Sequence, residues 1–205
     1  MRLMKIALLT LFLAGLIGCR GGDKTVARDE ILSRGQQQEA GDTDELIISK
    51  FSEDSDLGGW EVEDDVVMGG LSRGRFSINE EGNAVFSGDI SLENNGGFSS
   101  VQYYFDPIDV ARYTTALLRV RGDGKRYQFL VESERNDRHY YVYEFQTNGE
   151  WQIVEIPLAE MYPVYRGDRL DIPNFPGETI AQVRLFITGE KPDSFRIEIE
   201  KIWLK

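Results

Sequence analysis

Four polar residues of this sequence have the types needed for a hydrogen-bonded cluster: Asp65, Ser72, Asp123 and Arg166. A guanidinium presents a fork of donors that fits both oxygens of a carboxylate, and a hydroxyl can donate and accept at once. Arg166 could therefore fork onto one of the acids. Two interpretations stay open: the residues clamp the loops that carry them to one another, or they form a surface for a ligand or a partner.

Residue types that commonly carry catalysis are scarce in this chain. His139 is the only histidine, and one histidine with no identifiable partner makes neither a metal site nor a Ser-His-Asp arrangement. We therefore expect a packed or exposed ring at this position. Glycoside hydrolysis needs two acids about 5 to 10 Å apart, one with a raised pKa. Glu132, Glu134 and Glu144 fit by residue type only, and solvated strand faces explain them better, so the sequence predicts no enzyme and no catalytic residue.

Two glycine-containing segments lack the pattern of a nucleotide-binding loop. Gly122-Asp123-Gly124 has no third glycine and lies between two expected strands, where the dinucleotide fingerprint requires a helix. The same objection applies to Met68-Gly69-Gly70. The sequence accordingly predicts no cofactor and no metal.

Tyrosines are the residues best suited to contact a sugar. Two expected strands carry five of them: Tyr103, Tyr104, Tyr140, Tyr141 and Tyr143. Exposed rings on one sheet face could stack against a glycan, although alternation along a strand buries about half of such residues whatever the function. Carbohydrate binding is therefore an alternative function for this chain.

The elements that must position these residues are strands. Short runs rich in Val, Ile, Tyr and Phe are separated by Gly, Asn and Asp, and no convincing amphipathic helix or long repeat interrupts them. About ten strands are expected, at residues 46–51, 75–78, 84–90, 98–105, 116–120, 127–131, 141–145, 151–156, 183–187 and 195–199. A change of phase before Ile202 and Leu204 indicates a bulge. This number and spacing predict an all-β, two-sheet β-sandwich of jelly-roll type over residues 46–205.

The amino terminus has the pattern of a bacterial lipoprotein signal. Met1–Lys5 carries two positive charges, and residues 6–17 are apolar but too short a run to span a bilayer. Leu16–Cys19 resembles the lipobox, and Cys19 is the only cysteine. We expect a cleaved signal peptide at residues 1–18, lipidation of Cys19, and a flexible polar tether over 19–45. Attachment to a membrane would then be through the lipid anchor only, with the domain facing away from the cytoplasm.

The charge of the chain limits its partners. With 23 Lys and Arg against 35 Asp and Glu, the formal net charge is -12. Phosphate backbones and anionic head groups would repel such a domain, so we expect no nucleic-acid binding and no direct binding to a membrane surface.

Four motifs together resemble one known family. The first motif contains Asp65, Met68, Gly69, Gly70 and Ser72, and the second contains Gly97 and Phe98. The third motif contains Gly122, Asp123, Gly124 and Tyr127, and the fourth contains Arg166 and Gly167. In this order and spacing they resemble the family of the complex I intermediate-associated protein of thirty kilodaltons, over almost the whole domain.

The resemblance implies a galactose-binding-like β-sandwich and a non-enzymatic, chaperone-like role in the assembly of respiratory complex I. It also implies that the motif residues form or support a contact surface for a protein partner. The lipoprotein signal replaces the mitochondrial targeting segment of the best-known members. Because those act on the side that corresponds to the bacterial cytoplasm, the fold is expected to transfer, whereas the identity of the partner stays open.

Overall fold

The computed structural model describes residues 45–135 and 137–205, and these form thirteen strands and three short 3-10 helices. The predicted signal peptide, Cys19 and almost all of the predicted tether lie outside the described residues. The first elements are β1 (Leu46–Lys50), β2 (Trp60–Asp64), η1 (Asp65–Met68), β3 (Arg73–Ile78), β4 (Ala84–Ile90), η2 (Glu93–Asn95), β5 (Phe98–Asp109) and β6 (Thr115–Gly122). The others are β7 (Arg126–Glu132), β8 (Tyr140–Gln146), β9 (Trp151–Pro157), η3 (Leu158–Glu160), β10 (Tyr162–Tyr165), β11 (Asp168–Arg169), β12 (Thr179–Thr188) and β13 (Asp193–Leu204).

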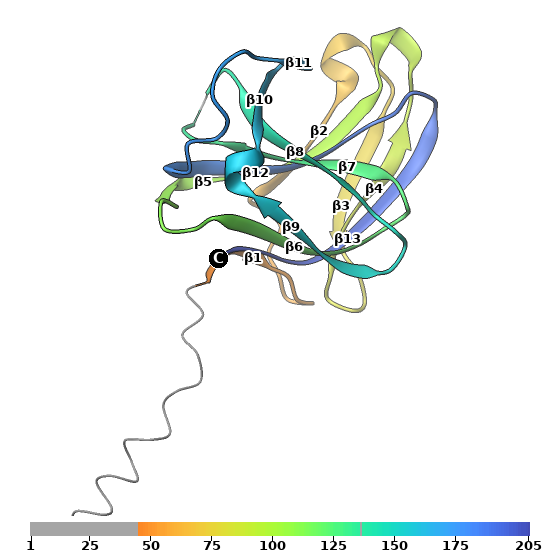
Figure 1. Ribbon diagram of the computed structural model, residues 1–205. Helices are drawn as coiled ribbons and strands as arrows, with labels where there is room; N and C mark the ends of the chain where they lie inside the picture. The colour runs from red at the N-terminus through yellow and green to blue at the C-terminus, as the bar shows by residue number, and fades with distance from the viewer. Residues whose placement is uncertain (1–44, 136) are drawn as a thin grey trace, which may run out of the picture. The chain divides into compact units, whose positions relative to one another are not determined.

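The strands form two antiparallel sheets (Figure 1). The six-stranded sheet has the order β3-β4-β13-β6-β9, with β1 also paired to β13. The seven-stranded sheet has the order β11-β10-β8-β7-β12-β5-β2. The first and last strands lie side by side, since Leu46 pairs with Leu204. The all-β sandwich predicted from the sequence is confirmed.

Alternation along the strands builds the core between the two sheets. On β13, Phe195, Ile197 and Ile199 are buried in this core. The pairing of β13 with β6 shifts register between Ile199 and Lys201, which is the bulge indicated by the sequence. The extra residue returns the next apolar side chains to the inner face. The largest fully buried side chains include Tyr127, Phe86, Phe129, Leu118, Ile156 and Met161.

All ten expected strands are present, and the structure adds three. The strand β2 is short and carries three acids, β10 contains Pro163, and β11 is a two-residue strand with both residues exposed. Proline and acidic residues are depleted in strands and are tolerated at sheet edges, so local composition does not reveal these segments. All three occupy or adjoin an edge of the seven-stranded sheet.

A glycine pair brings β3 and β4 unusually close. Gly74 pairs directly with Gly88, and a Cβ atom added to Gly88 would lie 2.0 Å from the carbonyl oxygen of Arg73. Backbone cannot move aside as a flexible side chain can, so this contact allows only hydrogen at the Cα of Gly88.

We predict that Gly88→Ala lowers the free energy of unfolding by about 2 kcal/mol, because the added methyl group overpacks the β3–β4 ladder. Gly58→Ala is the matched control, since its nearest neighbour is the side-chain Oδ1 of Asp56 at 3.1 Å. It should change the free energy of unfolding by less than ~0.5 kcal/mol. Urea titration of both variants measures the difference, and equal midpoints would contradict the prediction.

Candidate functional site

Asp65 connects two of the sequence motifs through a buried carboxylate. It follows β2 directly and is 1% exposed. Its Oδ2 accepts hydrogen bonds from the Ser72 hydroxyl at 2.6 Å, from the Gly97 N–H at 2.6 Å and from the Phe98 N–H at 3.3 Å. Its Oδ1 accepts from the Ser72 N–H at 3.1 Å. We call this set of residues, with Ser91, whose N–H donates to the Ser72 hydroxyl at 3.0 Å, the Asp65 clamp.

The clamp keeps Asp65 ionised. Burial raises the pKa of this carboxyl, but the hydrogen bonds from Ser72, Gly97 and Phe98 outweigh burial and hold the pKa below its ordinary value of 3.8. Glycine is required close by: a Cβ added to Gly70 would lie 2.1 Å from the Asp65 Oδ1, and one added to Gly96 would lie 2.5 Å from its Oδ2.

Asp123 lies in a second, separate cluster. Its Oδ1 accepts a hydrogen bond from the Tyr127 hydroxyl at 3.0 Å, and its Oδ2 accepts from the Arg196 backbone N–H at 2.9 Å and from the Lys125 ammonium at 3.1 Å. Burial, together with the negative charge of Asp123, raises the pKa of Tyr127. These bonds tie the turn between β6 and β7 to β13. Gly122 packs against Thr147, where a Cβ would lie 2.4 Å from the methyl group.

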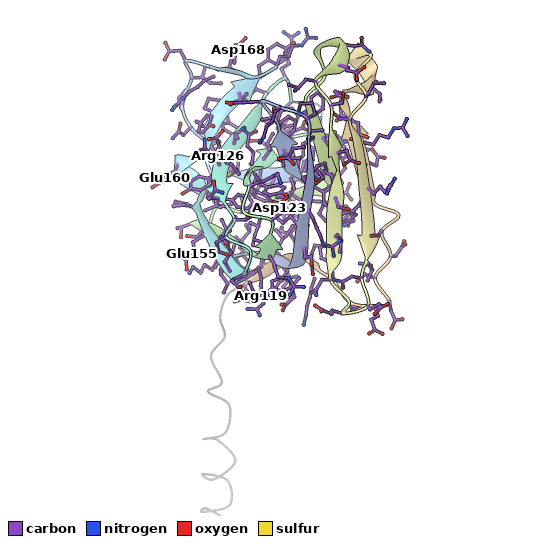
Figure 2. All side chains as sticks on the ribbon, turned by 90° about the vertical axis from the view of Figure 1, so that its right-hand side faces the viewer. Arg119, Asp123, Arg126, Glu155, Glu160 and Asp168 are labelled. Atoms are coloured by element: carbon purple, nitrogen blue, oxygen red, sulfur yellow. The ribbon has the colours of Figure 1, made fainter. Side chains whose placement is uncertain are left out.

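Arg166 and Gly167 form the exposed turn between β10 and β11, where both have positive φ angles of 51° and 89°. The Arg166 guanidinium lies 5.3 Å from the ring centre of Tyr165. The prediction that Arg166 forks onto Asp65 or Asp123 is wrong: Asp65 follows β2, at the opposite edge of the seven-stranded sheet from β10 and β11. Figure 2 likewise shows Asp168, beside this turn, well away from Asp123.

The remaining motif residues shape the backbone of the loops. Met68 ends η1, and Gly69 follows it with a left-handed φ of 83°, while its carbonyl accepts from the Asn94 amide at 2.8 Å. Gly124 also has a positive φ of 83°. Phe98 stacks on Phe186, with ring centres 5.2 Å apart. Most motif residues therefore hold loops in place, as the clamp interpretation expects.

The tyrosines divide between two faces. Tyr103, Tyr141 and Tyr143 pack into the core, whereas Tyr104 and Tyr140 alternate to the opposite face of the seven-stranded sheet. His139 packs edge-on against Tyr141, with ring centres 4.9 Å apart. Only two of the five expected platform tyrosines are therefore placed to contact a ligand on the outer face.

A polar cluster that sequence reasoning missed surrounds these two tyrosines on the outer face. Arg184 on β12 forms an ion pair with Glu63 at 2.9 Å, donates to the Tyr140 hydroxyl at 3.1 Å and also donates to Gln102 Oε1. The Gln182 amide donates to the same Gln102 oxygen at 3.0 Å. We call these residues, with Tyr104 and Glu132, the Arg184 cluster. Gln182 pairs across the sheet with Tyr104 on one side and Glu132 on the other.

The central residues of the Arg184 cluster are buried although they lie outside the core, whereas Tyr104, Tyr140 and Glu63 at its border are partly exposed. Arg184 is 6% exposed and Gln182 is fully buried. Burial, opposed by Arg184 and reinforced by Glu132, raises the pKa of Tyr140 to about 12. Burial and Glu132 also raise the pKa of Tyr104. The available sequence signal was weak: polar Gln182 and Arg184 alternate with apolar residues on a strand whose neighbours could not be known.

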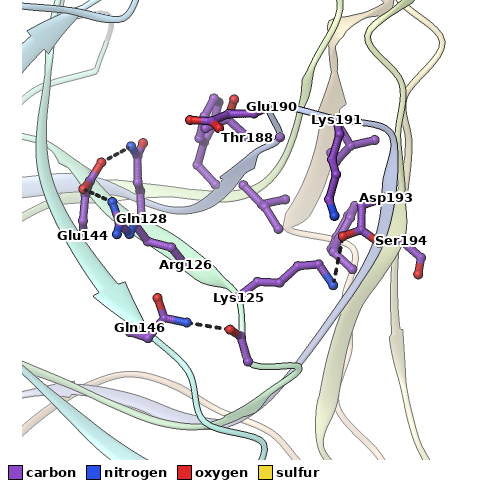
Figure 3. A pocket seen from close by; sticks show the side chains of 16 residues that line it. Lys125, Arg126, Gln128, Glu144, Gln146, Thr188, Glu190, Lys191, Asp193 and Ser194 are labelled. Atoms are coloured by element: carbon purple, nitrogen blue, oxygen red, sulfur yellow. Dashed lines mark hydrogen bonds and ion pairs between the residues drawn. The ribbon is translucent and has the colours of Figure 1, made fainter.

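A groove opens on the same face, at the other end of β12 (Figure 3). It encloses about 750 Å³ between the ends of β7 and β8 and the connection from β12 to β13. Its charged side chains are mixed in sign: Lys125, Arg126 and Lys191 against Glu144, Glu190 and Asp193. Two ion pairs lie among its lining residues, Lys125 with Asp193 at 3.6 Å and Arg126 with Glu144 at 3.7 Å.

Comparison with solved structures identifies the class of fold. The domain is a jelly-roll sandwich similar to the family 11 carbohydrate-binding module from Clostridium thermocellum, solved with a β-1,3-1,4-mixed-linked tetrasaccharide: TM-score 0.58, 15% identity, 78% of this chain and 94% of that one. The same module from the cellulosomal cellulase Lic26A-Cel5E matches at 0.58, with 16% identity over 78% of this chain and 93% of the other. An exo-β-agarase matches at 0.51, with 10% identity, over 78% of this chain and 24% of the enzyme. At such identities the likeness shows the fold alone.

The sequence identifies the family of the domain, whereas the fold identifies only its structural class. The model of the complex I intermediate-associated protein 30 (CIA30) family matches residues 49–199. The chain belongs to this family, as its four motifs indicated.

We predict that Asp65→Asn lowers the free energy of unfolding at neutral pH by roughly 2–4 kcal/mol, because the amide removes the buried charge that four donors surround. The folded pKa of Asp65 lies below 3.8. Its stabilising contribution is therefore complete above that pH and is lost as the pH falls through the folded value. The wild type and the variant should thus converge in stability on acidification. Urea titrations at several pH values between 7 and 3 measure this, and a pH-independent difference would argue against it.

Proposed function

We propose that this protein is a non-enzymatic binding module that holds a protein partner during assembly of a larger complex. Cys19 would anchor it by its lipid to a membrane of the bacterial cell envelope, with the domain facing away from the cytoplasm. Membership of the CIA30 family, whose description names complex I, supports an assembly role and makes a respiratory complex the first partner to test.

The observation that carries this proposal is a set of exposed apolar side chains on the loops of the Asp65 clamp. Val66 is 58% exposed, Leu71 is 48% exposed and Leu92 is 37% exposed. Apolar residues gathered on one part of a surface are typical of protein contact sites. Val66 belongs to η1, Leu71 precedes Ser72 and Leu92 follows Ser91, so each is next to or within a clamped segment.

The clamp gives these side chains a fixed presentation. Ser72 and Ser91 are hydrogen-bonded to each other, and the Asp65 carboxylate binds the loops on both sides. A contact surface held in its bound conformation loses less conformational entropy when the partner binds. A fixed geometry of the loops would thus serve binding, and most motif residues would act by holding the loops rather than by touching the partner.

We predict that Leu71→Asp lowers crosslinking of the full-length protein to its partner in the cells that produce it by at least about tenfold, since a charge would be buried at the contact. Ile153→Asp is the matched control, because Ile153 is 50% exposed on β9 of the six-stranded sheet and should retain capture. Mass spectrometry identifies the captured proteins. Cys19→Ala tests the anchor, since it should release the protein from the membrane fraction.

Capture of respiratory-complex subunits that depends on Leu71 and not on Ile153 would support the assembly role. If the wild type and both variants captured the same proteins equally well, the proposal that the clamp loops form the contact surface would be wrong. If Cys19→Ala stayed in the membrane fraction, the proposed lipid anchor would be wrong.

A further inference from the structure

We propose a second binding site on this molecule: the outer face of the seven-stranded sheet, from the Arg184 cluster to the groove beside Phe186, binds an uncharged, hydroxyl-rich chain, namely a neutral oligosaccharide. This inference does not depend on the protein contact at the clamp loops, because it uses different residues on a different part of the domain. The two functions considered for the sequence, protein binding and carbohydrate binding, are thereby assigned to two different surfaces of the domain.

The first argument is that buried polar atoms on this face lack partners. Among the described residues, neither the Arg184 Nε, a donor, nor the Gln182 Oε1, an acceptor, has a hydrogen-bond partner. Buried polar atoms are almost always paired, so the protein itself leaves this polar network incomplete. Neither atom is open to solvent, so a ligand hydroxyl would join the network through the half-buried Tyr140, whose hydroxyl accepts a hydrogen bond from Arg184 at 3.1 Å.

Charge balance selects an uncharged ligand. The Arg184 guanidinium is already paired with Glu63 at 2.9 Å, and Glu132 lies in the same cluster. The groove is lined by three basic and three acidic side chains, and two ion pairs are formed among them. An acidic or a basic ligand would have to displace an existing partner, whereas neutral hydroxyls can join these pairs without breaking them.

Aromatic side chains supply the apolar contacts that a sugar ring needs. Tyr104 and Tyr140 lie on the outer face at the Arg184 cluster, and Phe186 lines the groove. Arg184 lies 4.8 Å from the ring centre of Tyr140 and holds this ring in place. Flat apolar surfaces next to planar hydrogen-bonding groups suit a pyranose, which presents C–H groups on its faces and hydroxyls at its rim.

Strand order argues against a peptide bound as an added strand. Residues of β12 carry the site, and β12 pairs with β7 on one side and β5 on the other. Its main-chain groups are therefore occupied, and strand addition works only at a free sheet edge. A ligand on this face has to be recognised by side chains.

The site is elongated. Gln182, Arg184 and Phe186 are alternate residues of β12 and share the outer face, so about 13 Å separates the first from the third. The groove of about 750 Å³ begins at Phe186 and adds room beyond it. A chain of several sugar units can therefore lie along the strand, with Tyr104, which pairs with Gln182, and Phe186 marking the two ends of the contact.

The test uses the full-length protein and isothermal calorimetry with two sets of probes: neutral gluco-, galacto- and manno-oligosaccharides of four units, and acidic oligosaccharides of the same length. We expect binding to at least one neutral probe and none to the acidic probes. Tyr104→Ala should weaken that binding at least about tenfold, as loss of a stacking ring does. Tyr165→Ala, which removes an exposed tyrosine of the β10–β11 turn, is the matched control and should leave it unchanged.

Failure of every neutral probe to bind, selective binding of acidic probes, or equal loss of binding in Tyr104→Ala and Tyr165→Ala would overturn the proposal. Leu71→Asp should bind the saccharide normally, so failure of either proposed surface can be recognised separately.

Discussion

A carboxylate withdrawn from water has to be surrounded by donors, and one end of this sandwich is built around that requirement at Asp65. The Ser72 hydroxyl and three main-chain N–H groups meet it. The donors come from loops far apart in the sequence, so satisfying one charge fixes the path of both loops. Gly70 and Gly96 are part of the same arrangement, because a side chain at either position would occupy the place of the carboxylate.

On the outer face of the seven-stranded sheet, by contrast, the buried polar groups are not all paired. There Arg184, Gln182 and Gln102 are buried without belonging to the core, and some of their hydrogen-bonding capacity is left unused. Such a network lowers stability unless something completes it. Natural sequences retain local conflicts of this kind mainly at functional sites. The Asp65 clamp is thus a satisfied polar network, and the Arg184 cluster is an incomplete one.

Family and fold bear on different parts of the molecule. The motifs that indicate the CIA30 family lie mainly in the loops of the Asp65 clamp and in the turn around Asp123. Their hydrogen bonds fix the backbone geometry of these loops. The jelly-roll fold, shared with carbohydrate-binding modules at 15% identity, provides a broad sheet face that can be adapted independently. Because a sandwich hosts many functions, residues on each surface rather than the fold decide what is bound.

Local pattern in the sequence was enough to predict the fold class, ten of the strands and the bulge in β13, because alternation and turn-forming residues are local properties. It also brought Asp65 and Ser72 together as partners. It could not tell that Arg166 lies at the far edge of the sheet, nor which tyrosines face outward, since both depend on strand order and register. Gln102, Gln182, Arg184 and Glu63 come from three strands, and only the pairing of those strands in the folded sheet assembles them into one cluster.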